Sequence, residues 1–176
     1  MIKKSLSTVL MLAIAMTSFA QKNKKGADKP EGYQFTVVKE NPVTSVKNQA
    51  SSGTCWSYST ISFLESEAIK NGAPADIDLA EMYPVWNGYS DKAVKFVRLD
   101  GKLNYEQGSS FGDVLYTLKH YGMVPQKEME GLNYGEPMNK HGELVGVLKG
   151  YVNAVIKNPN RKLSTAWHKG LNGILD

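Results

Sequence analysis

The sequence predicts a mainly helical fold that makes up one domain or one large lobe. Three observations predict it: a long apolar repeat of helical period after residue 143, shorter helical patterns after Cys55 and Asp113, and breaks rich in Gly, Asn and Pro between them. Residues 35–38 are β-prone, but the run is short, and nothing after Cys55 indicates a β-rich lobe. Length and apolar content suit a single unit without internal repeats.

The first predicted helix runs from Cys55 to about Lys70. One of its faces is apolar, and Asn71-Gly72 supplies the stop. The residues on that face are Ile61, Leu64, Ala68 and Ile69, with Phe63 beside them.

Residues 78–82 follow a Gly-Ala-Pro break and predict a second, short helix with Leu79 and Met82 turned inward. Tyr83, Trp86 and Tyr89 come next as an aromatic group. They favour packing in the core or at a lobe interface, with a sugar or peptide platform as the alternative.

The third predicted helix covers residues 113–120 and follows Gly108, Ser109 and Ser110. Ser110 and Asp113 are spaced as a capping box in which Asp replaces Glu. Tyr121-Gly122 ends the helix, and Pro125 prevents it from resuming.

The strongest helical signal covers residues 144–155. Its apolar positions recur at helical spacing: Leu144, Val147, Leu148, Tyr151, Val152 and Val155. A final helix, capped by Ser164, places Trp167, Leu171 and Ile174 on one side. We expect the partner of that apolar side to lie beyond Asp176.

The N-terminus has the pattern of a secretory signal peptide over residues 1–20. Lys3 and Lys4 form the charged region, residues 6–16 the apolar core, and Ser18-Phe19-Ala20 the cleavage site. A retained membrane anchor is the alternative, although the apolar run is shorter than the roughly 20 residues that span a bilayer. Residues 21–31, rich in Lys, predict a solvated linker before a domain over residues 32–176. We therefore expect an exported protein, periplasmic or secreted.

The formal charge of +4 is small, and removing Lys3 and Lys4 lowers it further. This argues against a nucleic-acid partner. No His/Cys cluster has the spacing of metal ligands, so we expect no metal and no cofactor.

Cys55, the single cysteine, is the residue of this sequence that most strongly indicates a catalytic function. A cysteine that starts a helix meets unpaired backbone N–H groups, which favour the reactive thiolate. Gly53 permits a tight turn before it. Gln49, six positions earlier, can fold its amide back beside the sulfur and donate to a developing oxyanion. A buried, inert cysteine is the structural alternative.

The run Asn48-Gln49-Ala50-Ser51-Ser52-Gly53-Thr54-Cys55-Trp56 resembles the active-site signature of papain-like cysteine peptidases. Two departures stand in it: Ser52 replaces a cysteine that normally forms a disulfide, and Thr54 replaces a small residue. With residues 42–49 and the Leu79-Ala80-Glu81-Met82 segment, the chain is most similar to the bleomycin hydrolase and aminopeptidase C branch.

This resemblance implies an α+β papain-like fold in which the chain covers mainly the helical lobe and lacks the β-rich lobe. It implies Cys55 as nucleophile, Gln49 as oxyanion donor, and Gly108 and Ser109 in the wall that pairs with substrate. The catalytic His and Asn are expected beyond the chain end, since the base usually lies roughly 130–150 residues after the cysteine. His120, His141 and His168 all have ordinary structural explanations.

The expected activity is hydrolysis of peptide bonds, most specifically as an aminopeptidase, with peptides as substrates. A homo-oligomer, hexameric by resemblance, is expected, and no membrane partner after signal cleavage. A truncated, non-catalytic helical module for binding or assembly is the alternative function.

Overall fold

The computed structural model describes residues 32–133, 135–159 and 162–176. Two compact units divide the chain, Met1–Glu40 and Asn41–Asp176. The predicted signal peptide and linker, residues 1–20 and 21–31, lie outside the described residues. In the first unit, residues 32–40 contain no helix or strand, and the β-prone run at 35–38 is exposed. A strand needs a neighbour for its backbone hydrogen bonds, and residues 32–40 include none.

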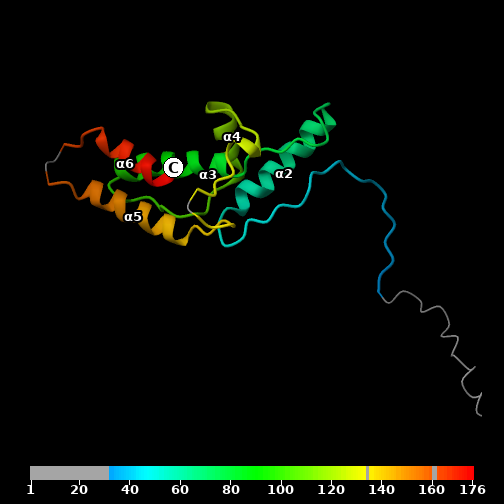
Figure 1. Cartoon of the computed structure of the whole chain (residues 1–176), viewed down its shortest axis with the longest axis horizontal. Helices are drawn as coiled ribbons and strands as arrows, with labels where there is room; N and C mark the ends of the chain where they lie inside the picture. Colours follow the sequence, from blue (N-terminus) through cyan, green and yellow to red (C-terminus); the bar gives the residue numbers. More distant parts are fainter. Residues whose placement is uncertain (1–31, 134, 160–161) are drawn as a thin grey trace, which may run out of the picture. The chain divides into compact units, whose positions relative to one another are not determined.

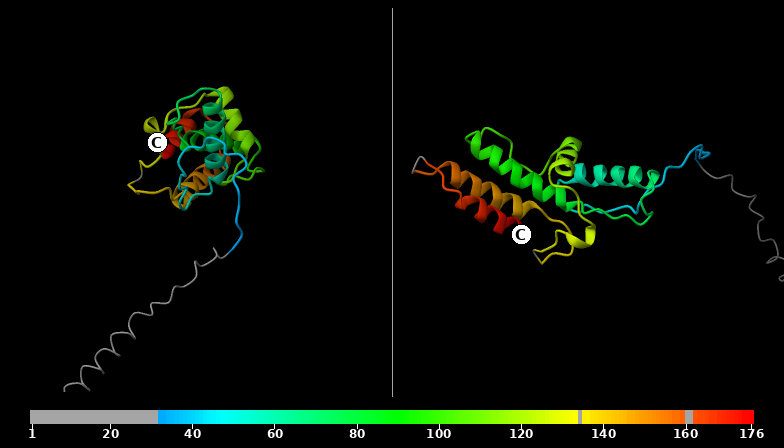
Figure 2. Two further views of the ribbon diagram at one scale, coloured as in Figure 1. Left: turned by 90° about the vertical axis from the view of Figure 1, so that its right-hand side faces the viewer. Right: turned by 90° about the horizontal axis from the view of Figure 1, so that it is seen from above.

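The second unit is helical (Figure 1). Its elements in chain order are α2 (Cys55–Lys70), α3 (Met82–Arg98), α4 (Phe111–His120), the 3₁₀ turn η1 (Gln126–Glu128), α5 (Gly142–Ile156) and α6 (Ala166–Leu175). Helix α3 contacts each of the other α-helices, with α2 and α4 around its beginning and α5 and α6 alongside it (Figure 2). None of the helices in the described ranges is both long and apolar enough to cross a membrane.

The prediction of a short helix at residues 78–82 is wrong, because α3 begins only at Met82. Asp78 and Ala80 instead pair with the chain around Pro125: the Ala80 N–H donates to the Val124 carbonyl at 3.0 Å, and the Gln126 N–H donates to the Asp78 carbonyl at 2.9 Å. These long-range bonds satisfy the backbone outside a helix, so α3 starts only at Met82 and then continues for 17 residues.

The aromatic residues of α3 pack, as the sequence favours. Tyr89 is buried in the main core, and Trp86 is partly buried. The Tyr83 hydroxyl donates to the Tyr121 carbonyl at 3.1 Å and so ties α3 to the end of α4.

Helix α4 begins at Phe111, two residues before the predicted start, and the predicted capping box is confirmed. The Asp113 carboxylate accepts from the Ser110 N–H at 2.9 Å and from the Ser110 hydroxyl at 2.8 Å. Burial raises the pKa of Asp113, but the hydrogen bonds from Ser109 and Ser110 and the Lys92 charge outweigh it and hold that pKa below its usual value.

The helix predicted over residues 144–155 is confirmed as α5, but its buried face differs. Val145, Leu148 and Val152 are buried, whereas Val147 is half exposed. The apolar residues of α5 span a wider face than the strip that α3 and α6 cover. The sequence alone therefore could not predict which of these residues are buried.

Helix α6 begins at Ala166, with Thr165 rather than Ser164 as its N-cap. The expectation that its apolar side needs a partner beyond Asp176 is wrong. Leu171 is buried in the core with Leu148 and Val152 of α5. The Tyr151 hydroxyl donates to the Trp167 carbonyl at 2.9 Å, so α5 supplies the partner.

Candidate active site

Cys55 is the first residue of α2 and its side chain is exposed. The Thr54 carbonyl accepts from the N–H groups of Ser57 and Tyr58, at 2.8 and 3.3 Å. No described side chain caps α2, and its first turn carries no acidic residue. Because the Ser57 N–H is bonded to Thr54, the Cys55 and Trp56 N–H groups are the first-turn donors that can stabilise negative charge at the sulfur.

The Gln49 side chain folds back onto the turn that precedes Cys55. Its side-chain Nε2 donates to the Ser52 carbonyl at 2.7 Å, and the Ser52 hydroxyl donates to the Gln49 carbonyl at 2.7 Å. A primary amide has two N–H donors, so Gln49 keeps one for a ligand. Ser52 also meets the buried Thr54, with the two hydroxyl oxygens 2.5 Å apart. The two residues that depart from the papain signature thus brace the turn with hydroxyl groups.

Ala50, next to Gln49, has a φ of 50°, in the left-handed region that residues with a Cβ seldom occupy. The Asn48 side chain accepts from its N–H at 2.9 Å. Such strain is retained where surrounding contacts determine the backbone. Here the left-handed φ of Ala50 directs the chain from Gln49 into the turn before Cys55.

The loop that holds Gly108 and Ser109 lies against this turn. The neighbouring Gln107 side chain accepts from the Gly53 N–H at 2.6 Å, and the Gln107 carbonyl accepts from the Trp56 indole at 3.0 Å. Gly108 is exposed, whereas the Ser109 hydroxyl is committed to Asp113 at 2.7 Å. Both predicted wall residues are therefore on a loop tied to the nucleophile's turn, although Ser109 also supports helix α4.

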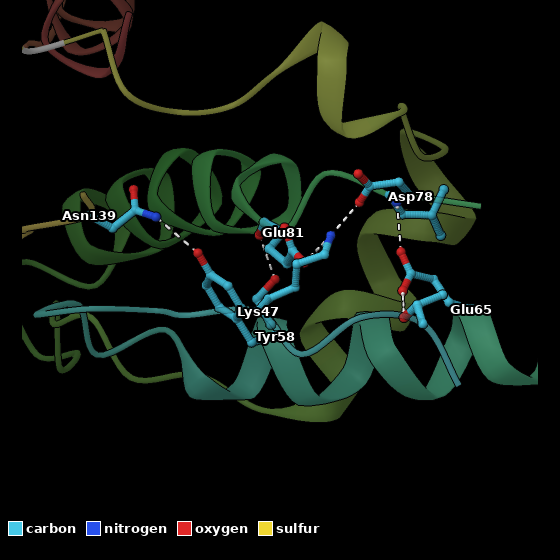
Figure 3. A network of polar contacts seen from close by, with 9 residues as sticks. Lys47, Tyr58, Glu65, Asp78, Glu81 and Asn139 are labelled. Atoms are coloured by element: carbon cyan, nitrogen blue, oxygen red, sulfur yellow. Dashed lines mark hydrogen bonds and ion pairs between the residues drawn. The ribbon is translucent and has the colours of Figure 1, made fainter. Parts of the chain in front are cut away.

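A partly buried network of charged and polar groups holds the segment that leads to Gln49, and the sequence analysis did not predict it. Lys47 reaches between Asp78 and Glu81, forming an ion pair with each (Figure 3). Glu65 of α2, 1% exposed, accepts from the Thr44 hydroxyl and from the Leu79 N–H, the latter at 2.7 Å. Glu65 follows Ile61 by one helical turn, which was the available signal for a buried acid.

Burial and neighbouring charges shift the pKa values of Lys47 and Glu81. Burial lowers the pKa of Lys47, but the hydrogen bond to Asp78 and the charges of Glu81, Asp78 and Glu65 outweigh it and raise that pKa. Burial raises the pKa of Glu81, against the opposing effects of its backbone hydrogen bond and of Lys47. Glu81 also accepts the Ser57 hydroxyl at its carbonyl, 2.6 Å away, so the network reaches the first turn of α2.

A third segment reaches the turn from the side of α5. Ser51 and Lys140 form an isolated parallel bridge, and the Asn139 amide donates to the Tyr58 hydroxyl at 2.9 Å (Figure 3). His141 follows Lys140, but it is only 2% exposed, and its Nδ1 lies 3.2 Å from the Tyr89 hydroxyl. Burial lowers the pKa of His141, so the ring is neutral at neutral pH and turned into the core.

The other two histidines have local aromatic neighbours. His120 packs on Tyr116, with ring centroids 4.1 Å apart, and His168 stacks on Trp167 at 3.8 Å. Within the described residues, no imidazole contacts Cys55. The described residues therefore place an exposed thiol beside backbone and amide N–H donors, and none of their imidazoles lies at that thiol as a base.

A large cavity lies elsewhere. It has a volume of about 1010 Å³ and is lined by α3, the loop after η1, the start of α5 and the end of α6. Ser51 is one of its lining residues, but Cys55, Gln49 and the 106–110 loop do not line it. The predicted site residues gather at the start of α2, outside this cavity.

Residues 30–85 match the family model described as papain family cysteine protease. The match contains Gln49, Cys55 and the Lys47 network and ends in the first turn of α3, before Gly108 and Ser109. It covers less than half of the chain. No curated protein matches the sequence. The segment around Cys55 is thus similar to papain family cysteine proteases, and a cysteine nucleophile is the chemistry which that similarity indicates.

Proposed function

We propose that this chain carries the nucleophile half of a thiol peptidase. The observation that supports this most is the exposed Cys55 at the uncapped start of α2, within the segment that is similar to papain family cysteine proteases. The sulfur attacks the peptide carbonyl to form an acyl-enzyme, which water then hydrolyses.

The oxyanion of each tetrahedral intermediate accepts from the Cys55 N–H and from the remaining N–H of the Gln49 amide. In this proposal a histidine, oriented by an asparagine, takes the thiol proton and returns it to the leaving amine. Gly108 and Ser109 offer backbone groups to an extended peptide.

The finer proposal is an exported aminopeptidase of the bleomycin hydrolase and aminopeptidase C type that assembles into a homo-oligomer. Its support is the signal-like N-terminus and the resemblance of residues 42–49 and 79–82.

A decisive experiment compares the wild type with Cys55→Ala and Gln49→Ala in the complete protein, using a fluorogenic peptide. Cys55→Ala should abolish hydrolysis, and Gln49→Ala should lower the rate on the order of 10²–10³-fold, because one oxyanion donor is lost. Ser66→Ala, on the exposed hydroxyl of α2, is the matched control and should leave the rate unchanged. Hydrolysis retained by Cys55→Ala would reject the proposal.

An alternative function is a non-catalytic module for binding or assembly. One observation favours it: α4 and its neighbours expose several large apolar side chains, including Phe63, Phe111, Leu115 and Leu118. Self-association without peptidase activity, in a protein whose Cys55 alkylates only in the alkaline range of ordinary thiols, would favour this alternative.

A further inference from the structure

The residues on both sides of Cys55 are bonded to one short loop. Gly53, two positions before the cysteine, donates its N–H to the Gln107 side-chain oxygen at 2.6 Å. Trp56, directly after it, donates its indole N–H to the Gln107 carbonyl at 3.0 Å. A single residue, separated from Gly53 by more than 50 positions, thus accepts from both flanks of the nucleophile.

Close packing accompanies these bonds. A Cβ added to Gly53 would lie 2.9 Å from the Gln107 Cβ, so only glycine allows the two backbones to approach this far. Trp56 is buried, and its ring edge lies against Gly88 of α3. The Gln107 contact therefore joins a turn and a loop that have little room to move.

Lys92 of α3 holds the loop that contains Gln107. Its ammonium group donates to the carbonyl oxygens of Glu106, at 3.3 Å, and Gly108. It also lies over the Trp56 ring, 5.9 Å from the centroid. Because both neighbours of Gln107 are held by one cation, the Gln107 carbonyl is left aimed at the indole.

We infer that Gln107 is a positioning residue for Cys55, which couples the turn of the nucleophile to the loop that carries the predicted substrate wall. This inference rests on the proposed function for its catalytic consequence, but not for the coupling itself. Gln107 does not touch the sulfur. It acts through Gly53 and Trp56, and sets the direction from which the thiolate meets a peptide lying along Gly108.

The test uses Gln107→Met, which keeps the length of the side chain but removes its acceptor, in the full chain. Gln107→Glu keeps an acceptor at the same place and should restore the wild-type behaviour. Glu106→Gln, in the same loop, weakens an ion pair with Lys149 and leaves the Gly53 contact intact, so it serves as the matched control.

Two readouts are needed. The first is amide hydrogen exchange at Gly53, measured by NMR without substrate. We expect exchange at least about tenfold faster in Gln107→Met than in the wild type, and unchanged in Glu106→Gln. Unchanged exchange in Gln107→Met would overturn the coupling. Thermal unfolding of each variant shows whether it is folded. If Gln107→Met does not fold, the exchange measurement is repeated on Trp56→Phe, which removes the bond from the indole N–H to the Gln107 carbonyl.

The second readout is peptide hydrolysis, resolved into kcat and KM. We expect kcat to fall about tenfold in Gln107→Met with little change in KM, because the orientation of the nucleophile changes more than substrate binding. Faster exchange with an unchanged kcat would overturn the positioning role. If the wild type itself hydrolyses no peptide, the proposed function fails and the positioning role in catalysis fails with it, whereas the exchange data still decide the coupling.

Discussion

The two ends of the helical unit are held together by different forces. Where α3, α5 and α6 meet, the buried side chains are apolar, with Leu148, Val152 and Leu171 at the centre. Along α2 many of the buried side chains are polar: Ser57, Thr60 and Glu65 are buried and bond to backbone or side-chain groups. The first end is stabilised mainly by burial of apolar area, and the second mainly by directional bonds.

This difference explains how Cys55 is placed. Apolar packing tolerates small shifts, whereas a buried polar network has few arrangements in which every group is bonded. The turn before Cys55 belongs to the second kind, and segments from residues 44–49, 106–108 and 139–141 converge on it. Changes at the apolar end should therefore alter stability, and changes at the polar end should also alter the site.

The largest expected effect on stability is at the apolar end. Leu148→Ala removes a fully buried side chain and should lower the free energy of unfolding by about 2–5 kcal/mol, measured by denaturant titration. Val147→Ala, on the half-exposed side of the same helix, should lose much less. The rate of Cys55 alkylation in the folded protein should not change in either variant. A changed rate in Leu148→Ala would show that the two ends are not independent.

At the polar end, Glu65→Ala removes the acceptor of the Leu79 N–H and of the Thr44 hydroxyl. We expect a loss of about 1–3 kcal/mol, because two partly buried donors lose their acceptor. Unlike Leu148→Ala, this change should also speed limited proteolysis within residues 41–49, which Glu65 and Lys47 hold in place. Glu65→Gln keeps an acceptor oxygen and should lose less. Equal proteolysis rates in the wild type and Glu65→Ala would contradict the role given to the network.

A pH titration tests His141, which connects the two ends. Because burial lowers its folded-state pKa below the usual 6.5, the unfolded chain binds the proton more readily. The stability should therefore fall as the pH falls through 6.5. Urea unfolding at several pH values between about 5.5 and 7.5 measures this slope. The slope should be smaller in His141→Asn, and an identical slope in both proteins would mean that His141 takes up its proton equally in the folded state.

The smallest effect is expected at Ala50. Ala50→Gly removes the Cβ that makes a left-handed φ costly, while glycine gives more freedom to the unfolded chain. These opposing terms leave a stabilisation between zero and about 1 kcal/mol. Ala68→Gly, inside α2, should instead destabilise by about 1 kcal/mol, as glycine does in a helix. A loss in Ala50→Gly equal to that in Ala68→Gly would remove the argument for strain beside Gln49.

Local signals in the sequence located much of the helical unit. The start of α2 at Cys55, the Ser110 capping box and the extent of α5 all follow from spacing and turn residues, which act within a few positions. The prediction failed at residues 78–82, because bonds to Val124 and Gln126, more than 40 positions away, override the local preference there.

The sequence by itself determined that Cys55 begins a helix and predicted it as the nucleophile, because both inferences depend on neighbours along the chain. Only the tertiary structure decided what surrounds it: the Lys47 and Glu65 network, the Gln107 contacts on both flanks, and the burial of His141 against Tyr89. These groups come from segments far apart in the chain. Each has an ordinary polar or charged side chain, whose partner is fixed by packing and not by spacing.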